Sequence, residues 1–389
     1  MTRPMRKCKE ALEAARGKIS RLAGSPLCAV AQKLGRDLEE AECAWRVGSS
    51  SPDSVSELCW SVSDVIDGLP QSFGQRFFFD AAMIRAMAAD WAGSMSLSPM
   101  VIPSYDRAWG HRSVQMPPEN RQQAHLIDLI LFPGDDRLEH VDLLAYPWVA
   151  HELGHYVVFQ DDSPFRDVFI PSLEKRLRSL VLSAIADRGA ARVKAQGVID
   201  ELSTFWTPSP DHKNWAHELA IDVIALWTCG PAYLASFQDE VERPQTNPYE
   251  ITQDHPPYEV RLGALLDASR DVGFYDYGEG LLAVRKGWGK SRWRSARDNR
   301  FATLADRALA GECVRAAFRF CESMKLTKWT TARLDVCRKR LDDEASLELG
   351  VDLLLSARMV FNEQGEPAFD DWERKTVRRL AQETMQLSR

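Results

Sequence analysis

The sequence contains no long apolar run and no secretory signal, and both absences restrict the class of protein. Its longest stretch without a charged side chain, residues 223–238, has 16 residues and includes a Gly-Pro pair. A helix that spans a membrane needs about 20 apolar residues. The basic N-terminus, residues 1–18, lacks the apolar segment of a signal peptide. We therefore expect no membrane span and a cytoplasmic location.

Paired cysteines and excess positive charge are also missing. The eight cysteines show no CxxC spacing, so a zinc ribbon is excluded and we interpret the cysteines as reduced. The net charge of -7 argues against nonspecific nucleic-acid binding by the whole chain. One basic segment with interleaved tryptophans, residues 285–300, has a composition compatible with nucleic acid. We prefer to interpret it as a basic loop that pairs with acidic surface, so nucleic acid is not an expected partner.

The clearest chemical signal that is present is an HExxH segment at residues 151–155. On a helix its two histidines lie one turn apart, so His151 and His155 can bind one zinc ion, and Glu152 can take a proton from metal-bound water. Pro147 suits the first turn of a helix, and apolar residues then repeat at helical spacing. We predict a helix from Pro147 to about residue 160.

A zinc site that performs chemistry needs a third protein ligand and an open fourth position. Asp161 follows His155 by six residues, where an extended form of the motif would supply this ligand. In that form a glycine makes the sharp turn before the ligand, but here the position is Val158, which resists a positive φ.

A second predicted helix, residues 214–227, offers two further candidates, His217 and Glu218. His217 points about 100 degrees away from Glu218 on a helix, so it is a poor co-ligand. Asp222 lies one turn after Glu218 and can accept the free N–H of a ligating imidazole. We take Glu218 as the ligand and Asp222 as its support. The plain alternative is a solvated acidic face on an amphipathic helix.

A third motif, HPPxxxR, runs from His255 to Arg261 and opens another predicted helix. The order HExxH, ExxxD, HPPxxxR resembles the gluzincin metallopeptidases, and in particular the group of the CAAX prenyl proteases and their bacterial heat-shock relatives. The resemblance covers residues 147–266. Members of that group are commonly embedded in membranes, whereas we expect no span here.

The resemblance implies a zincin-like metallopeptidase core and a role for each matched residue. It implies that Zn²⁺ is bound by His151, His155 and Glu218. It also implies that Glu152 is the catalytic base, that Asp222 is a supporting carboxylate, and that His255 and Arg261 line the active site near the oxyanion. His255 is then the first candidate for the donor to the oxyanion, and Arg261 or Tyr258 is the next.

These motifs predict a zinc-dependent peptide-bond hydrolase that acts on an intracellular protein or peptide. Two alternatives stay open. One is a regulatory or defence-type protein that cleaves a single partner. The other is a non-catalytic scaffold, in which zinc ties helices together and contributes folding free energy outright.

The pattern along the chain predicts a mainly α fold with a small β-sheet, in which a zincin-like core is flanked by helical regions. We place the N-terminal helical region at 1–70, the core at 71–270 and the C-terminal helical region at 271–389. The predicted elements are helices within 1–68 and at 77–91, a turn-rich stretch at 100–118, a strand at 124–132 and one long helix at 171–198.

Overall fold

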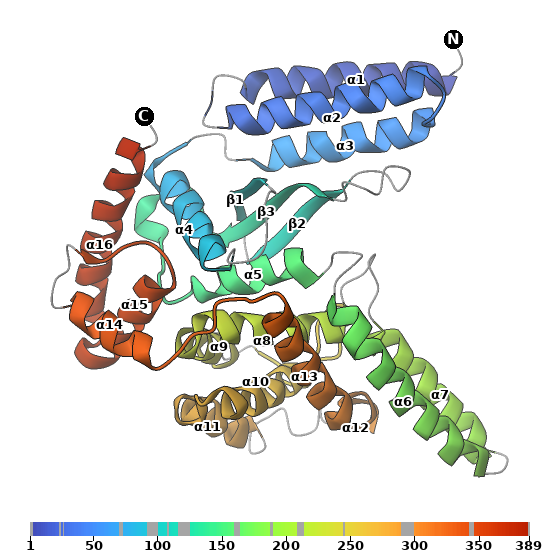
Figure 1. The fold of residues 1–389 in the computed structure, drawn as a ribbon, viewed down its shortest axis with the longest axis vertical. Helices are drawn as coiled ribbons and strands as arrows, with labels where there is room; N and C mark the ends of the chain where they lie inside the picture. The colour runs from blue at the N-terminus through green and yellow to red at the C-terminus, as the bar shows by residue number, and fades with distance from the viewer. Residues whose placement is uncertain are drawn as a thin grey trace. The chain divides into compact units, whose positions relative to one another are not determined.

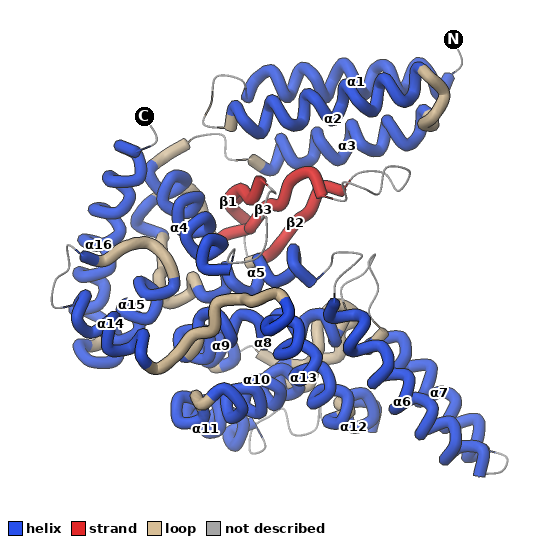
Figure 2. The backbone as a smooth tube through the Cα atoms, viewed as in Figure 1, coloured by secondary structure: helices blue, strands red, loops and turns tan. Residues whose placement is uncertain are grey.

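The computed structural model describes residues 3–22, 25, 27–69, 73–91, 100–106, 109–115, 125–158, 164–186, 190–207, 214–243, 246–288, 299–341 and 346–387. Most of these residues are helical, and one sheet of three strands is their β structure (Figure 2). The prediction of a mainly α fold with a small sheet is therefore confirmed.

The chain divides into two compact units. The first comprises Met1–Ile84, Leu97–Val141 and Val377–Arg389, and the second comprises Arg85–Ser96 and Asp142–Thr376. The domain boundaries expected from the sequence, at residues 70 and 270, stay a prediction.

Three helices of the first unit lie side by side (Figure 1): α1 (Arg3–Leu22), α2 (Cys28–Arg46) and α3 (Pro52–Gly68). They confirm the helices predicted within 1–68. Helix α3 begins where the side chain of Ser51 accepts a hydrogen bond from the N–H of Ser54, with a proline in the first turn. Buried residues on α1 repeat every three or four positions and face the other two helices: Cys8, Leu12, Ala15, Ile19 and Leu22.

Helix α4 (Gln75–Trp91) confirms the helix predicted at 77–91. The sheet follows it, with strands β1 (Met100–Asp106), β2 (Gly110–Gln115) and β3 (His125–Pro133) in the order β1-β3-β2. Strand β1 runs parallel to β3, and β2 runs antiparallel to it.

The strand predicted at 124–132 is confirmed as β3, which is the central strand. The turn-rich prediction for 100–118 is wrong over β1 and β2. Pro103, which suggested a turn, lies in the edge strand β1, where proline is tolerated because one side of the strand needs no ladder hydrogen bond.

In the second unit, α5 (Pro147–Val158) confirms the helix that carries HExxH. The next two helices, α6 (Pro164–Ala186) and α7 (Ala190–Trp206), lie side by side (Figure 1), so the single helix predicted at 171–198 is wrong. Pro171 lies inside α6 instead of opening a helix. Buried side chains before and after it, Phe169 and Leu173, hold the helix on both sides of the proline.

Helix α8 (Trp215–Cys229) lies at the centre of this unit and contacts α5, α7, α9, α10, α13 and α15. It begins where the side chain of Asn214 accepts the N–H of His217 at 3.0 Å, and it ends at Gly230. Every side chain of α8 is buried. The alternative of a solvated acidic face is therefore wrong, because Glu218 and Asp222 are both fully enclosed.

The described residues after α8 are also mainly helical, which agrees with the helical region predicted at 271–389. These elements are α9 (Pro231–Val241), α10 (Tyr258–Val272), η3 (Tyr275–Gly278), α11 (Glu279–Trp288), α12 (Asn299–Leu304), α13 (Arg307–Ser323), α14 (Ala332–Leu341), α15 (Val351–Gln364) and α16 (Glu366–Leu387), the last of which continues into the first unit. No helix within the described part of the chain combines the length and apolarity needed to cross a bilayer.

Candidate metal centre

A glycine lets the two helices of the site approach closely. Gly154 is the fourth residue of HExxH, and a Cβ atom built on it would lie 2.8 Å from Cγ2 of Ile221 on α8. Real Cβ atoms do not come so close to a neighbour. Because Gly154 has no side chain, α5 and α8 pack closely enough for a carboxylate on α8 to reach both histidines of α5.

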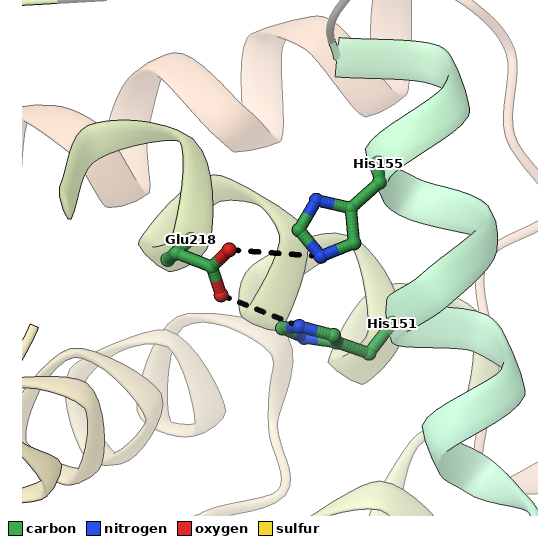
Figure 3. A group of neighbouring side chains, drawn as sticks. All are labelled: His151, His155 and Glu218. Atoms are coloured by element: carbon green, nitrogen blue, oxygen red, sulfur yellow. Dashed lines mark ion pairs between the residues drawn. The ribbon is translucent and has the colours of Figure 1, made fainter. Parts of the chain in front are cut away.

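The three predicted ligands meet across this contact. Figure 3 shows His151 and His155 pointing from α5 toward Glu218 on α8. Nε2 of His151 lies 3.4 Å from one carboxylate oxygen of Glu218, and Nε2 of His155 lies 3.6 Å from the other. One ligand atom from each residue lies within 4.8 Å of the others, so the group can hold a metal ion.

The burial of Glu218 supports that interpretation. Its side chain is 0% exposed, yet neither carboxylate oxygen has a well-formed hydrogen bond among the described residues. A buried carboxylate without hydrogen bonds is costly unless a cation binds it. Two imidazoles and one carboxylate form a donor set that zinc accepts. The residues present therefore fit a metal ion between the two helices.

Asp222 holds the far side of the first imidazole. Nδ1 of His151 lies 3.0 Å from Oδ1 of Asp222, so the ring can donate an N–H there and keep Nε2 for a metal. Arg261 in turn donates two hydrogen bonds to Asp222, at 2.7 and 2.8 Å. The guanidinium is enclosed by the rings of Trp148, Phe237 and Tyr258, at 5.3 to 5.7 Å.

Electrostatics in this cluster favour ionised carboxylates, and a metal ion bound at Nε2 of His151 would take the place of the second proton on that ring. Burial lowers the pKa of His151, but the carboxylates of Asp222 and Glu218 outweigh burial and raise that pKa to about 9. Burial raises the pKa of Asp222, but Arg261 outweighs it and holds the pKa well below its usual range. The pKa of Glu218 is likewise lowered, because His155 and His151 outweigh its burial. The carboxylates are thus ionised and ready to bind a cation.

Glu152 lies beside the ligands. One of its carboxylate oxygens is 3.7 Å from Nε2 of His155, and the residue is 4% exposed. The HExxH glutamate therefore lies next to a predicted ligand atom, and its role as a base stays a prediction.

His255 joins the cluster from the segment before α10. Its Nε2 lies 3.8 Å from Oε1 of Glu218, and its side chain is 50% exposed. All seven predicted site residues consequently form one connected group: His151, Glu152, His155, Glu218, Asp222, His255 and Arg261. The roles implied for them stay predictions.

The other two ligand candidates have different positions. His217 is buried on α8, with its ring 6.1 Å from that of Phe165, and it is not part of the three-residue group. Asp161 lies outside the described residues.

Sequence patterns missed one residue of the group, Tyr233 on α9. Its hydroxyl donates to Oδ1 of Asp222 at 2.5 Å and lies 3.3 Å from Nδ1 of His151. The available signal was weak: a single tyrosine in the uncharged stretch that follows ExxxD.

Comparison of the chain with protein-family models, curated proteins and solved structures finds no significant match to any of them. The functional argument therefore depends on the site itself.

Proposed function

We propose that this chain is a zinc-dependent peptidase of the gluzincin type, with a zincin-like core, that acts on a protein inside the cell. The observation that carries the proposal is the combination of two features. Three side chains that suit zinc converge from α5 and α8, and the carboxylate of Glu152 lies 3.7 Å from one of the ligand atoms.

The number of ligands supports a catalytic site. Structural zinc sites usually have four protein ligands, whereas catalytic sites have three and leave a position open. Among the described residues, the group that could hold a metal ion has three members, His151, His155 and Glu218. A zinc ion bound there would lower the pKa of its water to roughly 7 and polarise the scissile carbonyl.

Each protein residue then has a defined task. His151, His155 and Glu218 hold the metal. Glu152 accepts a proton from the attacking water and passes it to the leaving nitrogen of the cleaved bond. We assign His255 as the donor to the oxyanion, because its side chain is half exposed and its Nε2 lies 3.8 Å from Oε1 of Glu218.

We assign Arg261 a supporting task in place of the role near the oxyanion that the family resemblance implies. Its hydrogen bonds at 2.7 and 2.8 Å both go to Asp222, and three aromatic rings enclose its guanidinium. Arg261 therefore holds Asp222 ionised beside His151.

The test is the Glu152→Gln variant. Its amide cannot accept a proton but keeps the size and hydrogen-bonding shape of the carboxylate. We expect zinc content equal to wild type and a loss of turnover of roughly 10²- to 10⁴-fold on a quenched-fluorescence peptide library. Glu250→Gln, a change at an exposed position, is the matched control and should cleave at the wild-type rate. Cleavage by Glu152→Gln at the wild-type rate would refute the assignment of Glu152 as the catalytic base.

A non-catalytic scaffold is the second candidate, and the burial of the ligands favours it. His151, His155 and Glu218 are 3%, 1% and 0% exposed, as in a site that ties helices together. In that case Glu152→Gln would have no effect on the biological function of the chain. Removal of metal would instead unfold the second unit, because structural zinc contributes folding free energy.

A further inference from the structure

Tyr233 reaches the metal centre through a tight turn that only glycine permits. Gly230 ends α8 with φ +57, and a Cβ atom there would lie 2.5 Å from the ring of Trp329. The chain turns at this point into α9, which begins at Pro231. Tyr233, on the first turn of α9, is thereby directed back toward α5.

The hydroxyl of Tyr233 lies next to Asp222 and to one predicted ligand, His151. Its side chain is 0% exposed, and its hydroxyl donates to Oδ1 of Asp222 at 2.5 Å. The same hydroxyl lies 3.3 Å from Nδ1 of His151. The rings of Tyr233 and His151 are nearly parallel, with an interplanar angle of 11° and centroids 6.5 Å apart.

We propose that Tyr233 is a positioning residue for the metal centre: its hydroxyl fixes Oδ1 of Asp222, so that this carboxylate holds the Nδ1–H of His151 and directs Nε2 toward the metal. The inference rests on the proposed function, because it presumes that the site binds a metal. The hydrogen-bonding contacts of its hydroxyl are with Asp222 and His151, so its effect on the metal runs through these two residues.

Tyr233 and Arg261 hold Asp222 from different sides. Arg261 binds both carboxylate oxygens and supplies the balancing charge, at 2.8 Å to Oδ2 and 2.7 Å to Oδ1. Tyr233 adds no charge and binds Oδ1 alone, the oxygen that His151 also approaches at 3.0 Å. Arg261 therefore keeps Asp222 ionised, and Tyr233 sets where its Oδ1 lies relative to the imidazole. Partners of this kind typically change metal affinity 10- to 100-fold when they are removed.

The test is Tyr233→Phe, which removes the hydroxyl and keeps the ring. We would load the full chain with Co²⁺, measure its affinity by competition with a chelator, and record the visible absorption spectrum, which reports the ligand geometry. Tyr249→Phe is the control, since Tyr249 is a buried tyrosine of the same unit whose ring contacts Phe301 at 5.0 Å.

We expect Tyr233→Phe to bind Co²⁺ about tenfold more weakly and to shift the absorption spectrum, while Tyr249→Phe changes neither. In an Asp222→Asn background, Tyr233→Phe should cause almost no further loss, because its effect runs through that carboxylate. A purely structural role would give additive losses and an unchanged spectrum, which would overturn the inference.

The two proposals fail in different ways. If the wild-type chain binds no Co²⁺, the proposed function fails, and this inference fails with it. If wild type binds Co²⁺ and Tyr233→Phe binds it equally well, only the role of Tyr233 is refuted. If Tyr233→Phe does not fold at all, the hydroxyl is needed for folding itself, and the specific positioning role is rejected as well.

Discussion

The N-terminal bundle α1–α3 and the helix pair α5–α8 are both well buried, but their interiors are made of different residues. The described side chains of the bundle with 0% exposure are all apolar: Cys8, Ala15, Leu34, Leu38, Cys59 and Val62. At the same degree of burial, α8 carries Glu218 and Asp222, and α5 places two histidines and Glu152 against it. Burying an ion costs several kcal/mol before its partners compensate.

Stability alone therefore does not account for the charged side chains between α5 and α8. Apolar residues of similar volume would often serve as well as a buried ionic network in holding two helices together. The bundle shows that this chain can build such an interior. The polar groups between α5 and α8 are therefore best explained by a ligand that needs them, which for this donor set is a metal ion.

We expect the largest loss of stability from a substitution in the apolar bundle. Leu34→Ala removes a fully buried side chain and should destabilise the protein by about 2–5 kcal/mol. Metal content per folded chain should stay at the wild-type value, because no metal-site residue lies in the bundle. Urea unfolding and elemental analysis of the folded fraction would check both. A lower metal content per folded chain in Leu34→Ala would show that the metal site depends on the bundle interior.

A smaller effect is expected at the α5–α8 contact. Gly154→Ala places a methyl group 2.8 Å from Cγ2 of Ile221, and such overpacking costs typically 1–3 kcal/mol. Because the extra methyl separates the helices that carry the ligands, metal affinity should fall together with stability. Ile221→Ala in the same chain should restore part of the affinity. A Gly154→Ala variant with unchanged affinity would show that the close approach is not required by the site.

A third prediction concerns an acid of the second unit outside the candidate metal site. Burial raises the pKa of Glu373 to about 8, helped by Asp142 and Asp370, even though the N–H of Leu143 is donated to it at 2.6 Å. The folded protein therefore keeps a proton on Glu373 in a pH range where the unfolded chain, with a pKa near 4.5, has released it. The free energy of unfolding consequently falls as pH rises from about 4.5 to about 8.

Glu373→Gln removes this dependence. The variant should match wild type near pH 5 and be more stable at pH 8, as measured by urea unfolding at the two pH values. This result would distinguish a partly buried acid that costs stability at high pH from Asp222, which Arg261 keeps ionised. Equal stability at pH 8 would show that Glu373 titrates normally.

Much of the site follows from local sequence patterns, because helices and their ends are encoded locally. Pro147 and the spacing of His151 and His155 predict α5, and Gly230-Pro231 correctly marks the end of α8. The ExxxD spacing then places Glu218 and Asp222 on one face of a helix. None of these predictions requires a contact between residues far apart in the chain.

The rest depends on contacts between residues far apart in the chain. Tyr233 belongs to the site because the chain reverses at Gly230 and α9 then packs against α8, where the Tyr233 hydroxyl reaches Asp222. Strands β1 and β2 were missed because Pro103 reads locally as a turn residue, whereas its place in an edge strand depends on pairing with β3. The predicted helix begins too late, at residue 171, because a proline locally suggests a helix start. In the structure Pro171 lies inside α6, between the buried side chains of Phe169 and Leu173.

The most direct test of the central claim is the metal content of the purified protein beside Glu218→Ala, measured by elemental mass spectrometry. The account predicts about one zinc ion per wild-type chain and almost none in the variant, since two histidines alone make an incomplete site. Zinc retained in Glu218→Ala, or no metal in either protein, would contradict the claim that α5 and α8 together form a metal centre.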